Sequence, residues 1–248
     1  LFWNSYKLLY KFEIKMPFKK QELVNGEIYH ICYRAVGDEV IFKDVDDYYR
    51  GIFSVYEFNT TESIEIREQR RRRKIIKNLG GSILDTRKIF VENLAFCFMP
   101  NHIHLVVKQL KDNGISQFMK KMGTGYAVYF NRKYNRKGHL FNKFKAFHIA
   151  TDSQLKNVVT YIHCNPISLL EPGFKENGIK NPKKACKFLE NYKWSSYQDF
   201  IGIKNFSSLT SRDFILEIMG GKTVCKESVE NWIKYKGEIK DFDFTVLE

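Results

Sequence analysis

The chain has 248 residues, of which 44% are hydrophobic, and this is enough for one sizeable hydrophobic core. Its 41 lysines and arginines against 28 acidic residues give a net charge of +13, which favours a polyanionic partner, most simply a nucleic acid. Five scattered cysteines without a Cys-x-x-Cys pair argue against a disulfide framework and fit a reducing cytoplasm. Because no stretch approaches the roughly 18 apolar residues of a membrane span, we expect no membrane partner.

The first third of the chain begins with a segment of uncertain origin and then alternates strand and helix patterns. Residues 1–15 precede the first methionine, Met16, and we expect them to be an upstream extension without an assigned role. Residues 27–34 are aromatic and β-branched, which is typical of a strand. Residues 44–56 begin with acidic side chains and are predicted to form a helix. Residues 58–74 are polar and end in a run of basic side chains.

The middle of the chain contains a predicted hairpin followed by a long helix. Residues 90–98 and 102–108 are predicted strands, joined by a tight turn at Pro100. Residues 114–134 carry apolar side chains at spacings of three and four, which predicts an amphipathic helix. Residues 138–149 are predicted to be a loop that continues into a strand.

The remaining elements are mostly helical. Thr151 offers an N-cap oxygen to a helix that extends to Asn165, where Pro166 stops or kinks it. Residues 167–195 are predicted to be irregular with short helical pieces, and residues 211–237 to be a small helical tail. Because strands and helices interleave around an antiparallel hairpin, we predict an α+β fold. The expected form is a ferredoxin-like antiparallel sheet with helices packed on one face.

Two histidines, His102 and His104, are one residue apart inside an apolar run. Alternate side chains of a strand share a face, so both imidazoles would point the same way, while Ile103 and Leu105 would pack into the core behind them. This spacing predicts a two-histidine metal site, with a purely structural role as the alternative. Mg²⁺ or Mn²⁺ would suit phosphodiester chemistry, and Zn²⁺ is a further candidate.

Tyr161 and Asn165 are four residues apart and would share one helix face. A phosphotyrosine ester is close in energy to a phosphodiester, so a tyrosine nucleophile can break and reseal DNA without ATP, with a metal polarising the phosphate. Asn165 would supply a third metal ligand through its carbonyl oxygen. The alternative for Tyr161 is a core position, as we expect for Tyr126 and Tyr129. His163, about 200° around the helix from Tyr161, is expected to be structural.

Two basic segments are candidate DNA contacts. Lys143 and Lys145 alternate with phenylalanines, a pattern in which bases stack on the rings while the lysines bind the backbone. The alternative is that these rings belong to the core. Arg71 and Arg72 lie in the basic run and would contact phosphates without sequence preference. The alternative for them is a solvated basic face.

Four blocks occur in a fixed order along the chain. They are residues 95–105, with Pro-Asn-His-Ile-His, residues 126–141, residues 161–166, with Tyr-Ile-His-Cys-Asn-Pro, and residues 194–197, with Trp-Ser-Ser-Tyr. In this combination the chain resembles the single-tyrosine HUH transposases over roughly residues 24–200. Within them it is similar to the REP-associated tyrosine transposase branch of the IS200-like transposases.

The resemblance implies a metal-dependent DNA transposase that cleaves and rejoins single-stranded or hairpin DNA through a 5′-phosphotyrosine intermediate. It matches His102 and His104 to the metal pair of this family and Tyr161 to its nucleophile. Asn165 falls at the position of the third metal ligand. The resemblance does not decide between monomer and homodimer, and the expected location is cytoplasmic.

The implied catalytic domain covers residues 16–200, with residues 201–248 as a small helical appendage. Two other functions compete with transposition. A non-catalytic nucleic-acid-binding module would keep the basic surface without needing both histidines and Tyr161. A phosphodiesterase that uses water would need acidic ligands near the histidine pair, and none lies in that predicted strand.

Overall fold

The sheet of this protein has four antiparallel strands in the order β2-β3-β1-β4. The computed structural model describes residues 22–78, 85 and 87–235, so the segment 1–15 lies outside the described residues. The strands are β1 (Ile28–Arg34), β2 (Val91–Met99), β3 (His102–Gln109) and β4 (Lys145–Ile149). Because β3 lies between the mutually parallel β1 and β2, the order is that of a ferredoxin-like fold. The predicted α+β class is confirmed.

Helices connect and cover these strands. In chain order they are α2 (Val45–Glu57), α3 (Ile66–Asn78), α4 (Gly114–Lys133), α5 (Asp152–Cys164), α6 (Ile167–Leu170), α7 (Phe174–Asn177), α8 (Pro182–Asn191), α9 (Tyr197–Phe200), α10 (Arg212–Met219) and α11 (Lys222–Tyr235), with short 3₁₀ turns at Val36–Asp38 and Ser207–Leu209. Among the described residues, none of these helices is both long and apolar enough to cross a bilayer.

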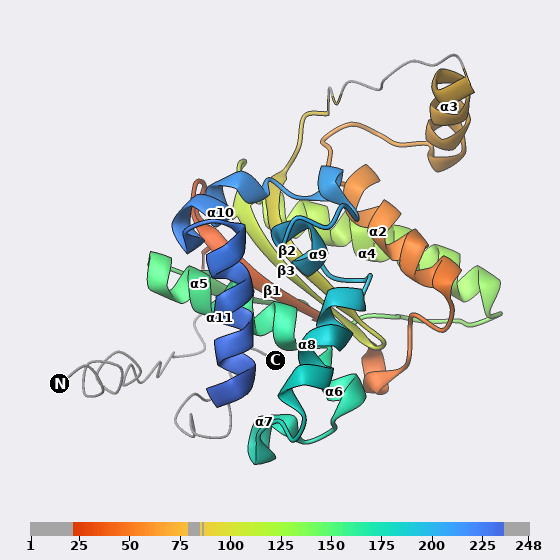
Figure 1. Cartoon of the computed structure of the whole chain (residues 1–248). Helices are drawn as coiled ribbons and strands as arrows, with labels where there is room; N and C mark the ends of the chain where they lie inside the picture. The colour runs from red at the N-terminus through yellow and green to blue at the C-terminus, as the bar shows by residue number, and fades with distance from the viewer. Residues whose placement is uncertain (1–21, 79–84, 86, 236–248) are drawn as a thin grey trace.

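One face of the sheet is covered by α2 and α4, the helices that connect β1 to β2 and β3 to β4 (Figure 1). Asp44 and Asp47 form a capping box that starts α2. This helix approaches the sheet closely at Gly51, where an added Cβ would lie 2.6 Å from the Phe98 ring. Ile103 and Leu105 of β3 are fully buried in this core, as their alternation with the histidines predicts.

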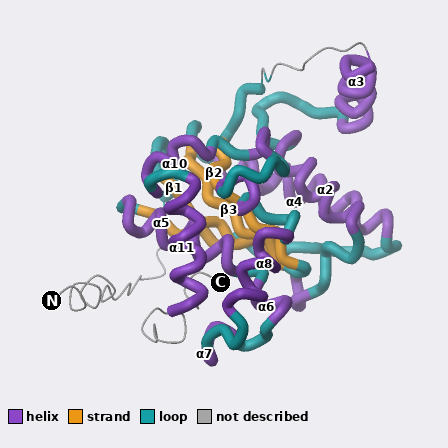
Figure 2. The backbone as a smooth tube through the Cα atoms, viewed as in Figure 1, coloured by secondary structure: helices purple, strands orange, loops and turns teal. Residues whose placement is uncertain are grey.

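The opposite face is also covered, by α5, α10 and α11 (Figures 1 and 2). The prediction that helices pack on one face only is therefore wrong in this detail. The reason lies in β2, whose residues 94–99 are continuously apolar and bury side chains on both faces of the sheet. Within the predicted tail, Ile215 and Cys225 are buried in this second core, so α10 and α11 help to cover the sheet.

The Trp-Ser-Ser-Tyr block extends the edge of the sheet next to β2. The Phe98 amide donates to the Trp194 carbonyl at 2.8 Å, and the Ser196 amide donates to the Phe96 carbonyl at 3.0 Å. His163 of α5 lies 2.9 Å from the Ser196 hydroxyl through its Nε2. The predicted structural role of His163 is thus a link between α5 and this edge of the sheet.

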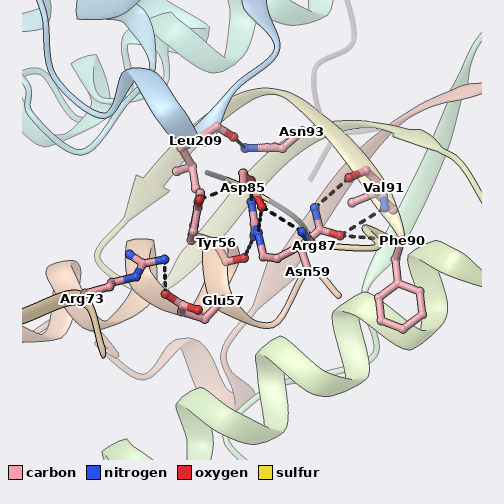
Figure 3. A network of polar contacts seen from close by, with 10 residues as sticks. All are labelled: Tyr56, Glu57, Asn59, Arg73, Asp85, Arg87, Phe90, Val91, Asn93 and Leu209. Carbon is pink, nitrogen blue, oxygen red and sulfur yellow. Dashed lines mark hydrogen bonds and ion pairs between the residues drawn. The ribbon is translucent and has the colours of Figure 1, made fainter. Parts of the chain in front are cut away.

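The basic run forms α3, which extends away from the sheet in Figures 1 and 2. Figure 3 shows how the chain around this helix is anchored. Arg73 of α3 forms an ion pair with the buried Glu57 of α2. Asn59, after α2, accepts from the amides of Phe90 and Val91 at 3.0 and 3.1 Å, which fixes the start of β2. Among the described residues, the ion pair of Arg73 therefore attaches one turn of α3 to α2.

Candidate active site

His102 and His104 lie on the face of β3 that α5 covers, and both are buried. Their ring centroids are 4.8 Å apart, with the ring planes nearly perpendicular at 82°. The strand register places Cys32 of β1 opposite His104 and Arg34 opposite His102. The predicted sharing of one strand face is confirmed. This face, however, is enclosed by helices rather than open to solvent.

Each of these histidines is held through its Nδ1 atom. His102 Nδ1 lies 2.6 Å from Asn101 Oδ1, an amide oxygen that can only accept, so this nitrogen carries the proton and Nε2 keeps its lone pair. His104 Nδ1 lies 2.9 Å from Nε2 of a third histidine, His30 of β1. Histidines that bind a metal commonly donate their second ring nitrogen to such a partner.

The nitrogens that face away from these partners meet the requirements of the metal that the resemblance implies. Among the described residues, His104 Nε2 is buried without a hydrogen-bond partner, as is Nδ2 of Asn165. Rotating the Asn165 amide by half a turn would place its carbonyl oxygen at that position. The residues therefore fit a divalent cation with two imidazoles and one amide oxygen. This set includes an amide oxygen, and the described part of the chain holds no group of three or more His, Cys, Asp or Glu side chains that could bind a metal ion.

The histidines of this cluster are uncharged near neutral pH. Burial lowers the pKa of His30 to about 3, and burial together with the Arg34 and Lys175 cations lowers that of His102 to about 3. Burial and the neighbouring histidines bring the pKa of His104 well below its usual range. A metal ligand must be the neutral imidazole, so the site favours the form that binds.

Tyr161 lies on α5 with its ring next to the histidines, and its side chain is only 1% exposed. Its ring centroid is 6.1 Å from that of His104, at an interplanar angle of 85°. Asn165 caps α5 one turn later, where its backbone amide donates to the Tyr161 carbonyl, so the predicted common helix face is confirmed. Burial raises the pKa of the Tyr161 phenol, and the nearby Arg34 cation opposes that rise.

A cavity of about 420 Å³ opens next to this cluster. Arg34, His102, Asn165 and Lys175 are among the side chains that line it, together with the hairpin turn between β2 and β3 and parts of α6 and α7. Tyr161 is not part of the lining, but Lys175 Nζ donates to its Oη at 3.2 Å. The cavity is therefore connected to the phenol through a cation.

The rival tyrosines occupy the other face of the sheet. Tyr126 is fully buried and its hydroxyl donates to the Ile41 carbonyl at 2.6 Å. Tyr129 donates to the buried Asp47 carboxylate at 3.0 Å. Both belong to α4 and lie far from the histidine cluster, on the opposite side of the sheet. Their expected packing role is confirmed.

Of the two predicted lysine contacts, Lys145 lies on the same face of the sheet as the histidines. Lys145 of β4 pairs with Cys32 of β1, which in turn pairs with His104, so the three residues form one row across the sheet. Directly opposed residues share a face, and two strand spacings amount to about 10 Å. Lys143 is exposed just before β4. The ring of Phe147, which the sequence pattern predicts to stack on bases, lies against His30 with ring centroids 5.8 Å apart.

The predicted arginine contacts are not brought to this site. Arg71 and Arg72 are both exposed on α3. In Figure 1 this helix lies at the opposite end of the molecule from α6 and α7, which border the cavity. Any phosphates that these arginines contact therefore belong to a different part of the nucleic acid.

Two functional candidates, His30 and Lys175, were not identified from the sequence. His30 had a usable signal, because it alternates with Cys32 and Arg34 along β1 and gives that strand one polar face. Lys175 had none, since it lies in a short irregular segment that only the fold brings to Tyr161.

Comparison with known families places these residues in context. Residues 55–165 match the family model described as "Transposase IS200 like", and this segment contains His102, His104, Tyr161 and Asn165. The match confirms the resemblance to IS200-like transposases inferred from the motifs. A solved structure of a REP-associated tyrosine transposase bound to a REP hairpin is similar at a TM-score of 0.47 with 11% identity, over 77% of this chain and 90% of that chain. No curated protein matches the chain.

Proposed function

We propose that this protein is a metal-dependent transposase that cleaves and rejoins single-stranded or hairpin DNA through Tyr161. The observation that carries the proposal is the buried cluster of His102, His104, Tyr161 and Asn165 beside a cavity lined by basic side chains. The match of residues 55–165 to the IS200-like transposases supports the same class of reaction.

His102 and His104, each through Nε2, and Asn165 through its amide oxygen would hold a Mg²⁺ or Mn²⁺ ion. When bound, the ion supplies positive charge that polarises the scissile phosphate. Asn101 and His30 would act as orienting partners, because each engages the Nδ1 atom of one ligand. His104 Nδ1 would then donate to His30, which leaves the lone pair of His104 Nε2 available.

Tyr161 would attack the phosphorus and remain joined to the 5′ phosphate, leaving a free 3′ hydroxyl. Because the new ester is close in energy to the phosphodiester, attack by a 3′ hydroxyl restores the DNA and the free phenol. Tyr161 is buried, so we expect α6, which forms part of the cavity wall, to shift when DNA enters. This enclosure would exclude water from the phosphotyrosine bond.

The basic candidates would hold the DNA in two places. Lys143 and Lys145 would contact phosphates close to the cleaved bond, because Lys145 lies in the same row as His104. Arg71 and Arg72 on α3 would contact the nucleic acid farther away. Monomer and homodimer both stay open, and a cytoplasmic location stays a prediction.

The division into a catalytic domain over residues 16–200 and an appendage over 201–248 also stays a proposal. The contacts of α10 and α11 with α5 lead us to expect that the appendage supports the helix that carries Tyr161. Its removal should therefore expose apolar surface on α5 and lower the stability of the catalytic part.

The decisive experiment treats the protein with a labelled pool of single-stranded hairpin oligonucleotides and Mn²⁺, followed by a denaturing gel. We expect a covalent protein–DNA band that the Tyr161→Phe variant lacks. Free cut DNA without a covalent band would indicate a phosphodiesterase that uses water. Binding without any cutting would indicate a nucleic-acid-binding module and would refute the proposed reaction.

A further inference from the structure

Lys175 is a cation in direct contact with the proposed nucleophile. Its Nζ donates to Tyr161 Oη at 3.2 Å and lies 5.4 Å from the centroid of the same ring. We propose that Lys175 is a catalytic residue that holds the attacking oxygen and neutralises charge that develops during phosphoryl transfer. This inference rests on the proposed function and assigns a further residue to the same site.

The position of Lys175 is set by a folded turn. The preceding Phe174 is 1% exposed and packs edge-on against Trp232 of α11, with ring centroids 5.9 Å apart. Gly173 begins α7 at a φ of +79°, a conformation that favours glycine. Glu171 accepts from the backbone amide of Lys180 at 2.8 Å, which closes the loop behind α7. Lys175 therefore projects from an anchored turn.

The chemistry of the cavity supports a phosphate next to Lys175. Arg34 and Lys175 both line it, beside His102 and Asn165, and the carboxylate of Glu176 is a further charge at its border. Arg34 also forms an ion pair with Asp38 at 3.1 Å. A phosphate seated here would meet two cations in a partly desolvated space, where their attraction is stronger than in water.

The covalent step balances without Lys175 losing its proton. A bond forms between Tyr161 Oη and phosphorus, the bond from phosphorus to the 3′ oxygen breaks, and the phenolic proton ends on that oxygen as a 3′ hydroxyl. Lys175 donates a hydrogen bond to the phenolic oxygen before attack and faces a phosphoryl oxygen as charge builds there. Preorganised donors of this kind typically accelerate a step by about 10²–10³-fold.

The test measures the rate of adduct formation at saturating hairpin DNA and, separately, the Kd for the same DNA. For Lys175→Met we expect the rate to fall by about 10²–10³-fold while Kd changes only a few-fold. Lys175→Arg keeps the charge and should recover part of the rate. Lys183→Met, at an exposed lysine of α8, is the matched control and should behave as the wild type.

The outcomes separate this inference from the proposed function. An adduct that survives Tyr161→Phe would refute the function itself. An adduct that requires Tyr161 but forms at the wild-type rate in Lys175→Met would refute the role of Lys175. A weaker Kd with an unchanged rate would make Lys175 a DNA contact only and would also overturn the inference. If Lys175→Met does not fold, Lys175→Ala with added ethylammonium replaces it, and restored adduct formation is expected.

Discussion

The two faces of the sheet bury similar kinds of side chain with opposite consequences. On the face covered by α4, the hydroxyls of Tyr126 and Tyr129 are fixed on protein acceptors, the Ile41 carbonyl and the Asp47 carboxylate. On the face covered by α5, His104 keeps a buried nitrogen without a partner among the described residues. Buried polar groups are normally satisfied, so the face with an open nitrogen is the one on which function is expected.

The largest expected effect is the loss of adduct formation when the Tyr161 hydroxyl is removed, and removal of the Tyr129 hydroxyl on the other face is the comparison. Tyr161→Phe deletes one oxygen and almost no volume, so the fold and the DNA affinity should persist while adduct formation disappears. Tyr129→Phe should leave the adduct intact and lower the free energy of unfolding by about 1 kcal/mol, because its hydrogen bond to Asp47 is removed. Gel assays and urea unfolding measure the two quantities. Mass spectrometry should find the nucleotide on the peptide with Tyr161, and an adduct elsewhere would disprove the assignment.

A second comparison contrasts two buried histidines behind the same sheet face. His102 would be a metal ligand, so His102→Ala should abolish measurable Mn²⁺ binding by calorimetry while the fold persists. His163 is bonded to Ser196, so His163→Gln should keep Mn²⁺ affinity and lower the free energy of unfolding by about 1–3 kcal/mol. Undiminished Mn²⁺ binding by His102→Ala would place the metal elsewhere.

The sequence was informative wherever function depends on regular spacing. Strand alternation placed His102 and His104 together, and helical spacing placed Tyr161 next to Asn165. The hairpin at Pro100 and the order of strands and helices sufficed for the fold class. These features are local, so short-range rules predict them.

What the sequence did not predict depends on contacts between distant segments. The bond between His30 and His104 joins residues 74 positions apart, and no local spacing indicates it. The covering of both sheet faces does not follow from strand alternation, because it depends on the continuous apolar stretch 94–99 of β2, which is buried on both sides. Lys175 reaches Tyr161 only because α7 folds back against α11.

An intermediate effect is expected at His30, which would orient a ligand without touching the metal. His30→Phe removes the hydrogen bond to His104 Nδ1 but keeps a ring that can still pack between His104 and Phe147. We expect Mn²⁺ affinity to fall by about 10–100-fold. His30→Gln provides a new acceptor and should restore part of it. A second readout is nitrogen NMR of the metal-free protein, in which the loss of His30 should change the tautomer populations of His104.

Unchanged metal affinity in His30→Phe would show that the contact serves packing alone. If His30→Phe unfolds and His30→Gln does not, the Mn²⁺ affinity of the Gln variant decides. Binding of Mn²⁺ by His30→Gln that is no better than by a His102→Ala control would again mean that the contact serves packing alone. The two variants therefore test orientation separately from folding.

The smallest effects should distinguish the two basic regions. Replacing Lys143 and Lys145 by Met should reduce the salt dependence of single-strand binding by about 0.7 in slope for each phosphate that is no longer neutralised. This reduction should occur even with oligonucleotides just long enough to cover the cleavage site, because Lys145 lies in the row of His104.

Replacing Arg71 and Arg72 by Gln should alter the slope only for longer hairpins, since α3 lies at the other end of the molecule. Fluorescence anisotropy over a range of salt concentrations measures both slopes, with short and long DNA compared for each variant. An equal effect of the arginine variant on short DNA would mean that α3 bends over the cavity when DNA binds, and an unchanged slope at both lengths would remove Arg71 and Arg72 from the interface.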